Sequence, residues 1–175
     1  MTRRLTSEDV GDLVAAEKDI RDRIGNRGLD VTAMAAISNI YRAATVVRNH
    51  MEQTVLAEHE LSWGGFTVLF VLWIWGPQET RHLAEEAGVS KGTLTGLIAT
   101  LTKRGLVTRQ PHPDDRRLAI IALTDKGQTT IEQAYPRFNA EETAAASSLS
   151  VREQDALASS LRKIIRTFNP VSDAK

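Results

Sequence analysis

Residues 80–101 carry the pattern that most restricts how this chain can fold. The segment reads TRHLAEEAGVSKGTLTGLIATL, two short helical stretches separated by Gly88. Ala84 supplies the small residue that two crossing helices need, and Gly88 supplies the turn. The second stretch has apolar residues at helical spacing, namely Leu94, Leu97, Ile98 and Leu101. The segment therefore predicts a helix-turn-helix in which an apolar seam seats the second helix on the first.

The opposite face of the second helix is short, polar and cationic. Its residues are Lys91, Thr93, Thr95, Ala99, Thr100 and Lys103. Ser90 precedes them as a helix cap, where backbone amides can also hold a phosphate. The major groove of DNA admits one helix and offers it hydrogen-bonding base edges flanked by phosphates. The face suits a major-groove helix, although the same pattern alone also fits an ordinary pair of core helices.

A β-hairpin is predicted directly after this helix. Residues 106–110 and 116–123 alternate as strands, and residues 111–115 form a Pro- and Asp-rich turn between them. Arginines flank that turn at Arg109, Arg116 and Arg117. Residues 88–117 carry six Lys or Arg and two Asp, a net charge of +4, whereas the whole chain sums to zero. Such a local basic segment is typical of a phosphate-binding surface.

Long amphipathic helices are predicted on both sides of this central part. Apolar stripes follow residues 32–59 and 151–168, and a further helix is expected at 6–24. Pro136 is expected to interrupt or kink the helix that Thr124 caps. One chain cannot easily cover these stripes, so a two-fold dimer is expected in which 6–24, 32–59 and 125–168 interlock. The alternative is that the stripes pack on the core of a monomer.

Composition and motifs exclude several other classes. The 175 residues include no cysteine, which excludes disulfides and Cys-based metal sites. The longest apolar run, residues 66–75, is too short for a bilayer span of about 20 residues, and the N-terminus has no signal peptide pattern. No phosphate-binding glycine loop, nucleophile elbow or HExxH motif is present, so no enzyme is expected. We expect a cytoplasmic protein without cofactor, metal or membrane partner.

Residues 83–127 resemble the MarR-type winged helix-turn-helix transcriptional regulators. The segment reads LAEEAGVSKGTLTGLIATLTKRGLVTRQPHPDDRRLAIIALTDKG. The wing motif of that family, Asp-x-Arg, three residues and Leu-x-Leu-Thr, matches from Asp115 to Thr124, with Ile121 at the first Leu. The resemblance implies a mainly α fold with a small β-hairpin wing, in which long N- and C-terminal helices form the dimer. It also implies that Arg117 enters the minor groove and that Asp115 orients the wing arginines.

The resemblance further implies how the chain is divided. An N-terminal extension would occupy residues 1–31, the regulator domain 32–168, and a C-terminal tail 169–175. Within the regulator domain, 61–123 would bind DNA, and the flanking segments 32–60 and 124–168 would dimerise. The helix at 6–24 lies outside the common core of the family.

Two recognition helices would enter successive major grooves of a near-palindromic double-stranded operator. The residues expected to contact DNA are Ser90, Lys91, Thr93, Thr95, Lys103, Arg109, Asp115, Arg116 and Arg117. Gly96 stands where many members of the family have a larger polar residue, which removes one side chain from base reading. Repression is the expected mode, because a dimer over a promoter blocks the polymerase without further machinery.

A ligand pocket is also implied, because similar regulators bind a small aromatic anion between the dimer region and the winged domain and then release DNA. The candidate residues are Tyr41, Arg48, Trp63, Phe66 and Phe70. The alternative is that aromatic side chains at helical spacing belong to the ordinary hydrophobic core.

Two other functions stay open. One is a metal-responsive regulator that uses His50 with Glu52 or Glu58, and the other is a helical dimerisation module that does not bind DNA.

Overall fold

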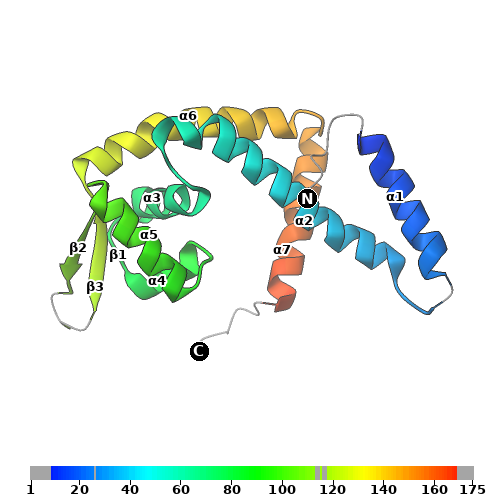
Figure 1. Cartoon of the computed structure of the whole chain (residues 1–175), viewed down its shortest axis with the longest axis horizontal. Coiled ribbons are helices and arrows are strands. Elements are labelled where there is room, and N and C mark those ends of the chain that lie inside the picture. Colours follow the sequence, from blue (N-terminus) through cyan, green and yellow to red (C-terminus); the bar gives the residue numbers. More distant parts are fainter. Residues whose placement is uncertain (1–8, 26, 113–114, 116–117, 169–175) are drawn as a thin grey trace. The chain divides into compact units, whose positions relative to one another are not determined.

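The computed structural model describes residues 9–25, 27–112, 115 and 118–168 (Figure 1). The helices are α1 Asp9–Ile24, α2 Val31–Thr54, a short 3-10 helix Leu56–His59, α3 Trp63–Trp75, α4 Thr80–Glu86, α5 Lys91–Lys103, α6 Asp125–Ala146 and α7 Val151–Phe168. The strands β1 Gln78–Glu79, β2 Val107–Pro111 and β3 Ala119–Leu123 form one antiparallel sheet in the order β1-β3-β2. This mainly helical fold with a β-hairpin confirms the predicted class.

The chain forms two compact units, residues 1–47 and 48–175. In the first unit, a polar network joins α1 to α2. Asn39 Nδ2 donates to Glu17 Oε1 at 2.8 Å, and an Arg42 guanidinium nitrogen lies 3.5 Å from the same oxygen. Asp30 caps α2, since the Ala33 amide donates to its carboxylate at 2.9 Å. These contacts within 1–47 hold α1 and α2 as a helical hairpin.

Side-chain caps begin four helices, including the two that the sequence predicts to begin after Ser90 and Thr124. Ser62, Ser90 and Thr124 each accept the amide N–H three residues further on, at 3.2, 3.1 and 3.0 Å. At α7, the Glu153 carboxylate accepts the Ser150 hydroxyl and amide at 2.6 and 2.8 Å. The Ser150 hydroxyl and then its amide lower the pKa of the Glu153 carboxyl. These local bonds explain why the helix starts follow from sequence.

Several predicted boundaries are wrong. The helix expected over 32–59 ends at Thr54 and is followed by a 3-10 turn that closes at Glu60 in the left-handed region, φ 52°. The sequence predicts Thr80 as the cap of the first helix of the helix-turn-helix. Thr80 is instead the first residue of α4, and Glu79 holds the cap position with extended backbone. The α6 helix continues from Asp125 to Ala146 through Pro136, so the expected interruption does not occur, and the kink expected as its alternative stays a prediction.

The sheet also differs from its prediction. The strand expected over 116–123 begins at Ala119, and the first strand is shifted by one residue, to Val107–Pro111. A third strand, β1, pairs with β3 through Gln78 opposite Ile121 and Glu79 opposite Ile120. A strand of two residues has no period that a sequence pattern can reveal. It ties the chain just before α4 to the hairpin.

The core of the second unit lies around α3, which contacts α4, α5, α6 and β3. Six of its 13 residues are buried, namely Gly65, Phe66, Val68, Leu69, Val71 and Leu72. Aromatic rings fill the seam between α3 and α6. Phe66 stacks on Phe138 with ring centroids 4.2 Å apart, and the ring centroids of Phe70 and Tyr135 are 5.2 Å apart.

In the described part of the chain, no helix has the length and hydropathy of a membrane span.

The start of α6 packs directly against the backbone that follows α5. Thr124 donates from its amide to the Leu106 carbonyl at 3.1 Å and from its hydroxyl to the Gly105 carbonyl at 2.7 Å. A Cβ added at Gly127 would lie 2.0 Å from the Leu106 carbonyl oxygen. Only glycine therefore allows this close approach. The contact fixes the hairpin and α5 to the first turn of α6.

Candidate DNA-binding surface

The predicted helix-turn-helix is formed by α4, a four-residue turn over 87–90, and α5. Gly88 turns the chain in the left-handed region, φ 64°, and the Val89 amide donates to the Ala84 carbonyl at 3.0 Å. Leu83 and Ala84 are buried where α4 packs on α5. The small residue and the turn glycine therefore have the roles that the sequence predicts.

The two faces of α5 are divided as its sequence predicts. Leu94, Ile98 and Leu101 are buried. The exposed residues include Lys91, Thr93, Thr95, Ala99, Thr100 and Lys103. The hydroxyls of Thr95 and Thr100 donate to the helix carbonyls four residues earlier, at 2.9 and 3.0 Å. Their outward lone pairs are left as acceptors, the property that a base amino group needs in a partner.

Strands β2 and β3 form the hairpin, called the wing below, beside α5 (Figure 1). Arg109 lies opposite Ile121 in the register and is exposed. At the tip, the Leu118 amide donates to the Asp115 carbonyl at 2.9 Å, and the Asp115 amide donates to His112 Nδ1 at 3.3 Å. Arg116 and Arg117 lie outside the described residues, so their predicted DNA contacts, and the orienting role predicted for Asp115, stay predictions.

A cavity of about 680 Å³ lies between α5, the first turn of α4 and the wing. Three cationic side chains line it, Arg81, Lys91 and Arg109, with Leu94 and Ile98 among its apolar lining. Arg81 is missing from the sequence prediction, which considered the second helix and the wing but not the first helix. Arg81 Nε pairs with the carboxylate of the exposed Glu85, at 3.1 Å. Exposed pairs of this kind contribute little, so a phosphate can replace the carboxylate.

Arg104, which contributes to the basic segment predicted from sequence, is a structural residue instead. Its guanidinium donates to the Glu60 carbonyl at 2.5 Å and to the His59 carbonyl at 2.8 Å. Its side chain is 27% exposed. The guanidinium therefore satisfies the carbonyls of the left-handed corner before α3 and does not face solvent as a phosphate contact.

Replacing Arg104 by alanine is expected to lower the free energy of unfolding by about 1.5–3 kcal/mol, because charged hydrogen bonds to two carbonyls are lost. Urea denaturation measures the loss. Variants that still fold should keep the wild-type dependence of DNA affinity on salt. If the slope of log affinity against log salt concentration fell by about one unit, Arg104 would instead be a phosphate contact.

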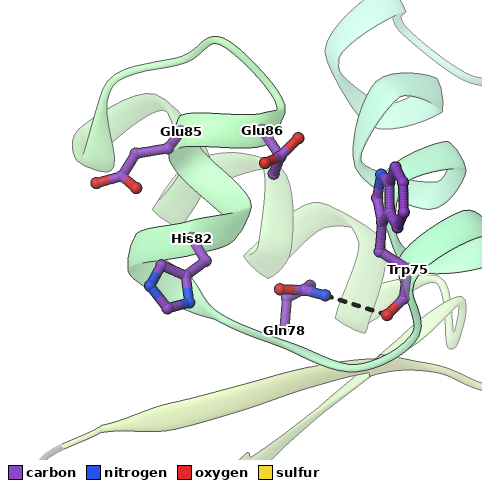
Figure 2. A pocket seen from close by; sticks show the side chains of 5 residues that line it. All are labelled: Trp75, Gln78, His82, Glu85 and Glu86. Atoms are coloured by element: carbon purple, nitrogen blue, oxygen red, sulfur yellow. Dashed lines mark hydrogen bonds between the residues drawn. The ribbon is translucent and has the colours of Figure 1, made fainter. Parts of the chain in front are cut away.

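A second cavity, of about 350 Å³, is lined by Trp75, Gln78, His82, Glu85 and Glu86. Figure 2 shows Glu86 on the side of α4 nearer to Trp75, whereas the Glu85 carboxylate points away from Trp75 and Gln78. Gln78 Nε2 donates to the Trp75 carbonyl at 3.2 Å. Two carboxylates line this hollow, which disfavours a polyanion. The cavity is therefore not part of the candidate DNA-binding surface.

The residues of the metal alternative each have another partner. His50 Nε2 lies 2.6 Å from Glu141, the Trp63 amide donates to Glu52 at 2.9 Å, and Glu58 pairs with Arg137. Among the residues that the structure describes, no group of three or more potential ligands is placed to hold a metal ion. The structure therefore offers no support for a metal site at these residues.

The residues predicted for a ligand pocket fall in different surroundings. Trp63, Phe66 and Phe70 belong to the aromatic seam with α6, and Phe66 is only 5% exposed. Arg48 is exposed in the second unit. Tyr41 lies in the first unit and is 72% exposed. The stacking of Phe66 favours the core alternative for that ring, and the pocket itself stays a prediction.

A helix-turn-helix with an exposed polar, cationic second helix, followed by a β-hairpin, defines a winged helix-turn-helix DNA-binding protein. A sequence model described as MarR family matches residues 61–118. The HTH-type transcriptional regulator YwaE of Bacillus subtilis (strain 168) is 38% identical over 136 residues, which cover 78% of this chain and 80% of YwaE. The chain belongs to the MarR family of transcriptional regulators, and this assignment agrees with the expectation that it is not an enzyme.

Solved structures of regulators share the fold. Sco3205 of Streptomyces coelicolor, a MarR family regulator solved in complex with DNA, has a TM-score of 0.76 at 22% identity, covering 83% of this chain and 96% of Sco3205. BpsR of Bordetella bronchiseptica, whose DNA binding is regulated by 6-hydroxynicotinic acid, has a TM-score of 0.66 at 24% identity, covering 74% of this chain and 98% of BpsR. These likenesses confirm the winged-helix fold.

Proposed function

We propose that this chain is a homodimeric repressor that binds a near-palindromic operator through α5 and the wing and is released by a small aromatic ligand. The observation that carries the DNA-binding part is the exposed face of α5, where Lys91 and Lys103 mark the two ends of a row of small polar residues. Lys91 also shares a cavity with Arg81 and Arg109. Three cations beside one exposed helix suit two strands of phosphates flanking a groove.

Each contact has a distinct role in this proposal. Lys91, Lys103, Arg81 and Arg109 bind phosphates, which gives affinity without sequence preference. The hydroxyl oxygens of Thr93 and Thr95 accept hydrogen bonds from base edges, which gives the preference. Ser90 holds the first turn of α5 in place, because its hydroxyl already caps the Thr93 amide. Arg117 adds the minor-groove contact that the family resemblance implies, and Arg116 a further DNA contact.

The dimer is proposed because α7 leaves an apolar face uncovered. Although the whole of α7 is described, none of its residues is buried. Leu157 is 50% exposed, Ile165 58% and Phe168 79%. A second copy that covers this face would also place two copies of α5 on one duplex, which the small contact area of a single helix requires. We propose residues 32–60 and 124–168 as the dimerisation region, 61–123 as the DNA-binding part and 1–31 as an extension.

The ligand response is proposed on two grounds. BpsR, a protein of the same fold, responds to 6-hydroxynicotinic acid, an aromatic acid. Aromatic side chains also gather between α3 and α6, where the proposed DNA-binding part meets the proposed dimerisation region. A ligand releases DNA only if it binds more tightly to a dimer geometry that does not fit the operator.

Fluorescence anisotropy tests the proposal. The purified protein is titrated on a duplex that it selects from a randomised library and on a scrambled duplex, over a series of salt concentrations. We expect two chains per site, strong salt dependence and a clear preference for the selected duplex, and Lys91→Ala should lower the salt slope by about one unit. Equal, weak binding to both duplexes would overturn the proposal and favour a dimerisation module without operator binding.

A further inference from the structure

Gly96 lies at the middle of α5, on the line of the helix that points away from the core. At 100° per residue, Leu94, Ile98 and Leu101 define the buried side, and Gly96 falls nearly opposite them. A Cβ built at Gly96 meets no described atom within 4 Å, and its φ is not in the left-handed region. Nothing in the described fold therefore requires a glycine at this position.

Other glycines near α5 are held by a close approach of neighbouring atoms or by a positive φ. A Cβ at Gly64 would lie 3.0 Å from Leu97 Cδ1, and one at Gly127 would overlap the Leu106 carbonyl. Gly88 and Gly105 have φ of 64° and 70°. Gly96 has neither constraint, although glycine is the least favourable residue in a helix interior after proline.

Longer side chains stand on both sides of this bare position. Thr95 and Lys91 lie toward the cation-lined cavity, whose lining they share with Arg81 and Arg109. Thr93 and Thr100 are exposed on the other side. A helix with its side chains is about 10–12 Å across and the major groove is about 12 Å wide, so bulk on the outermost line limits how deeply the helix can enter.

We infer that Gly96 is a specificity-determining residue of the DNA-binding surface. Because no side chain projects from this position, the backbone of α5 approaches the base edges, and the short hydroxyls of Thr95 and Thr100 reach them. A larger residue would hold the helix away from the groove floor while leaving the phosphate contacts of Lys91 and Lys103 in place. The inference rests on the proposed function.

Gly96→Ala and Gly96→Gln test the inference. Binding is measured by anisotropy on the duplex selected by the wild-type protein and on the scrambled duplex, and Tm is measured for each variant. We expect both substitutions to raise Tm by about 2 °C, because both residues favour the helix. We expect Gly96→Ala to weaken binding to the selected duplex by about tenfold, and Gly96→Gln to weaken it more. Affinity for the scrambled duplex should not change.

A merely structural role for Gly96 would not lower affinity while raising stability. Equal or tighter binding of both variants to the selected duplex would overturn the inference and leave the proposed function intact. Equal losses on both duplexes would also overturn it, because the substitution would then act on general affinity. If the wild-type protein selects no duplex, the proposed function fails first, and the inference fails with it.

Discussion

Replacing Gly127 by alanine is expected to lower the free energy of unfolding by about 3 kcal/mol or more, a large part of the stability of a domain of this size. The added Cβ would lie 2.0 Å from the Leu106 carbonyl oxygen and 3.0 Å from its carbonyl carbon. Backbone atoms cannot move aside as a flexible side chain can. The first turn of α6 would have to separate from Leu106 and give up the Thr124 hydrogen bonds to Leu106 and Gly105.

Chemical denaturation monitored by circular dichroism measures the effect, and Gly92→Ala is its matched control. A Cβ at Gly92 meets only the Ser90 hydroxyl, at 3.9 Å, among the described atoms. The same substitution there should stabilise the protein by about 0.5–1 kcal/mol through helix propensity. A Gly127→Ala variant as stable as the wild type would show that α6 and Leu106 are not in close contact in solution.

Placing a glutamate on the apolar face of α7 is expected to dissociate the dimer and with it most of the operator binding. Leu157→Glu and Ile165→Glu alter positions that are 50% and 58% exposed in the single chain, which therefore tolerates the charge. In a dimer the same carboxylate would be buried without a partner, at a cost of several kcal/mol. Analytical ultracentrifugation should find monomers, and affinity for the selected duplex should fall by about 100-fold or more.

Lys163→Glu is the control for that prediction. Lys163 lies on the far side of α7 from Leu157 and Ile165 and is exposed, so a carboxylate there stays in water. We expect this variant to remain a dimer and to bind the duplex. Dimers that persist in both Leu157→Glu and Ile165→Glu would refute the assignment of α7 to the dimer interface.

Much of the candidate site follows from sequence because its determinants are local. Leu94, Ile98 and Leu101 recur at helical spacing, so the exposed face of α5 is fixed once the buried face is known. Ser90 and Thr124 bond to amides three residues away, which a sequence pattern captures. The family resemblance adds the minor-groove role of Arg117, which no local pattern assigns to a groove; this residue lies outside the described part of the chain.

Other assignments depend on residues that are distant in sequence. Arg104 counts as a free positive charge until the fold brings it to the carbonyls of His59 and Glu60, more than 40 residues earlier. Arg81 gains its place beside Lys91 only from the packing of α4 against α5. Charge counting by segment cannot separate these two arginines, because partners rather than composition decide which one faces solvent.

The sequence by itself determined the helix-turn-helix, the hairpin and the polar face of α5, because periodicity, caps and turn residues act over a few neighbouring positions. Only the tertiary structure decided that β1 joins the sheet, that Phe66 stacks on Phe138, and that Gly127 must lack a side chain. Each of these depends on how closely two distant backbone segments approach. That distance is set by packing across the whole core, which local sequence preferences do not encode.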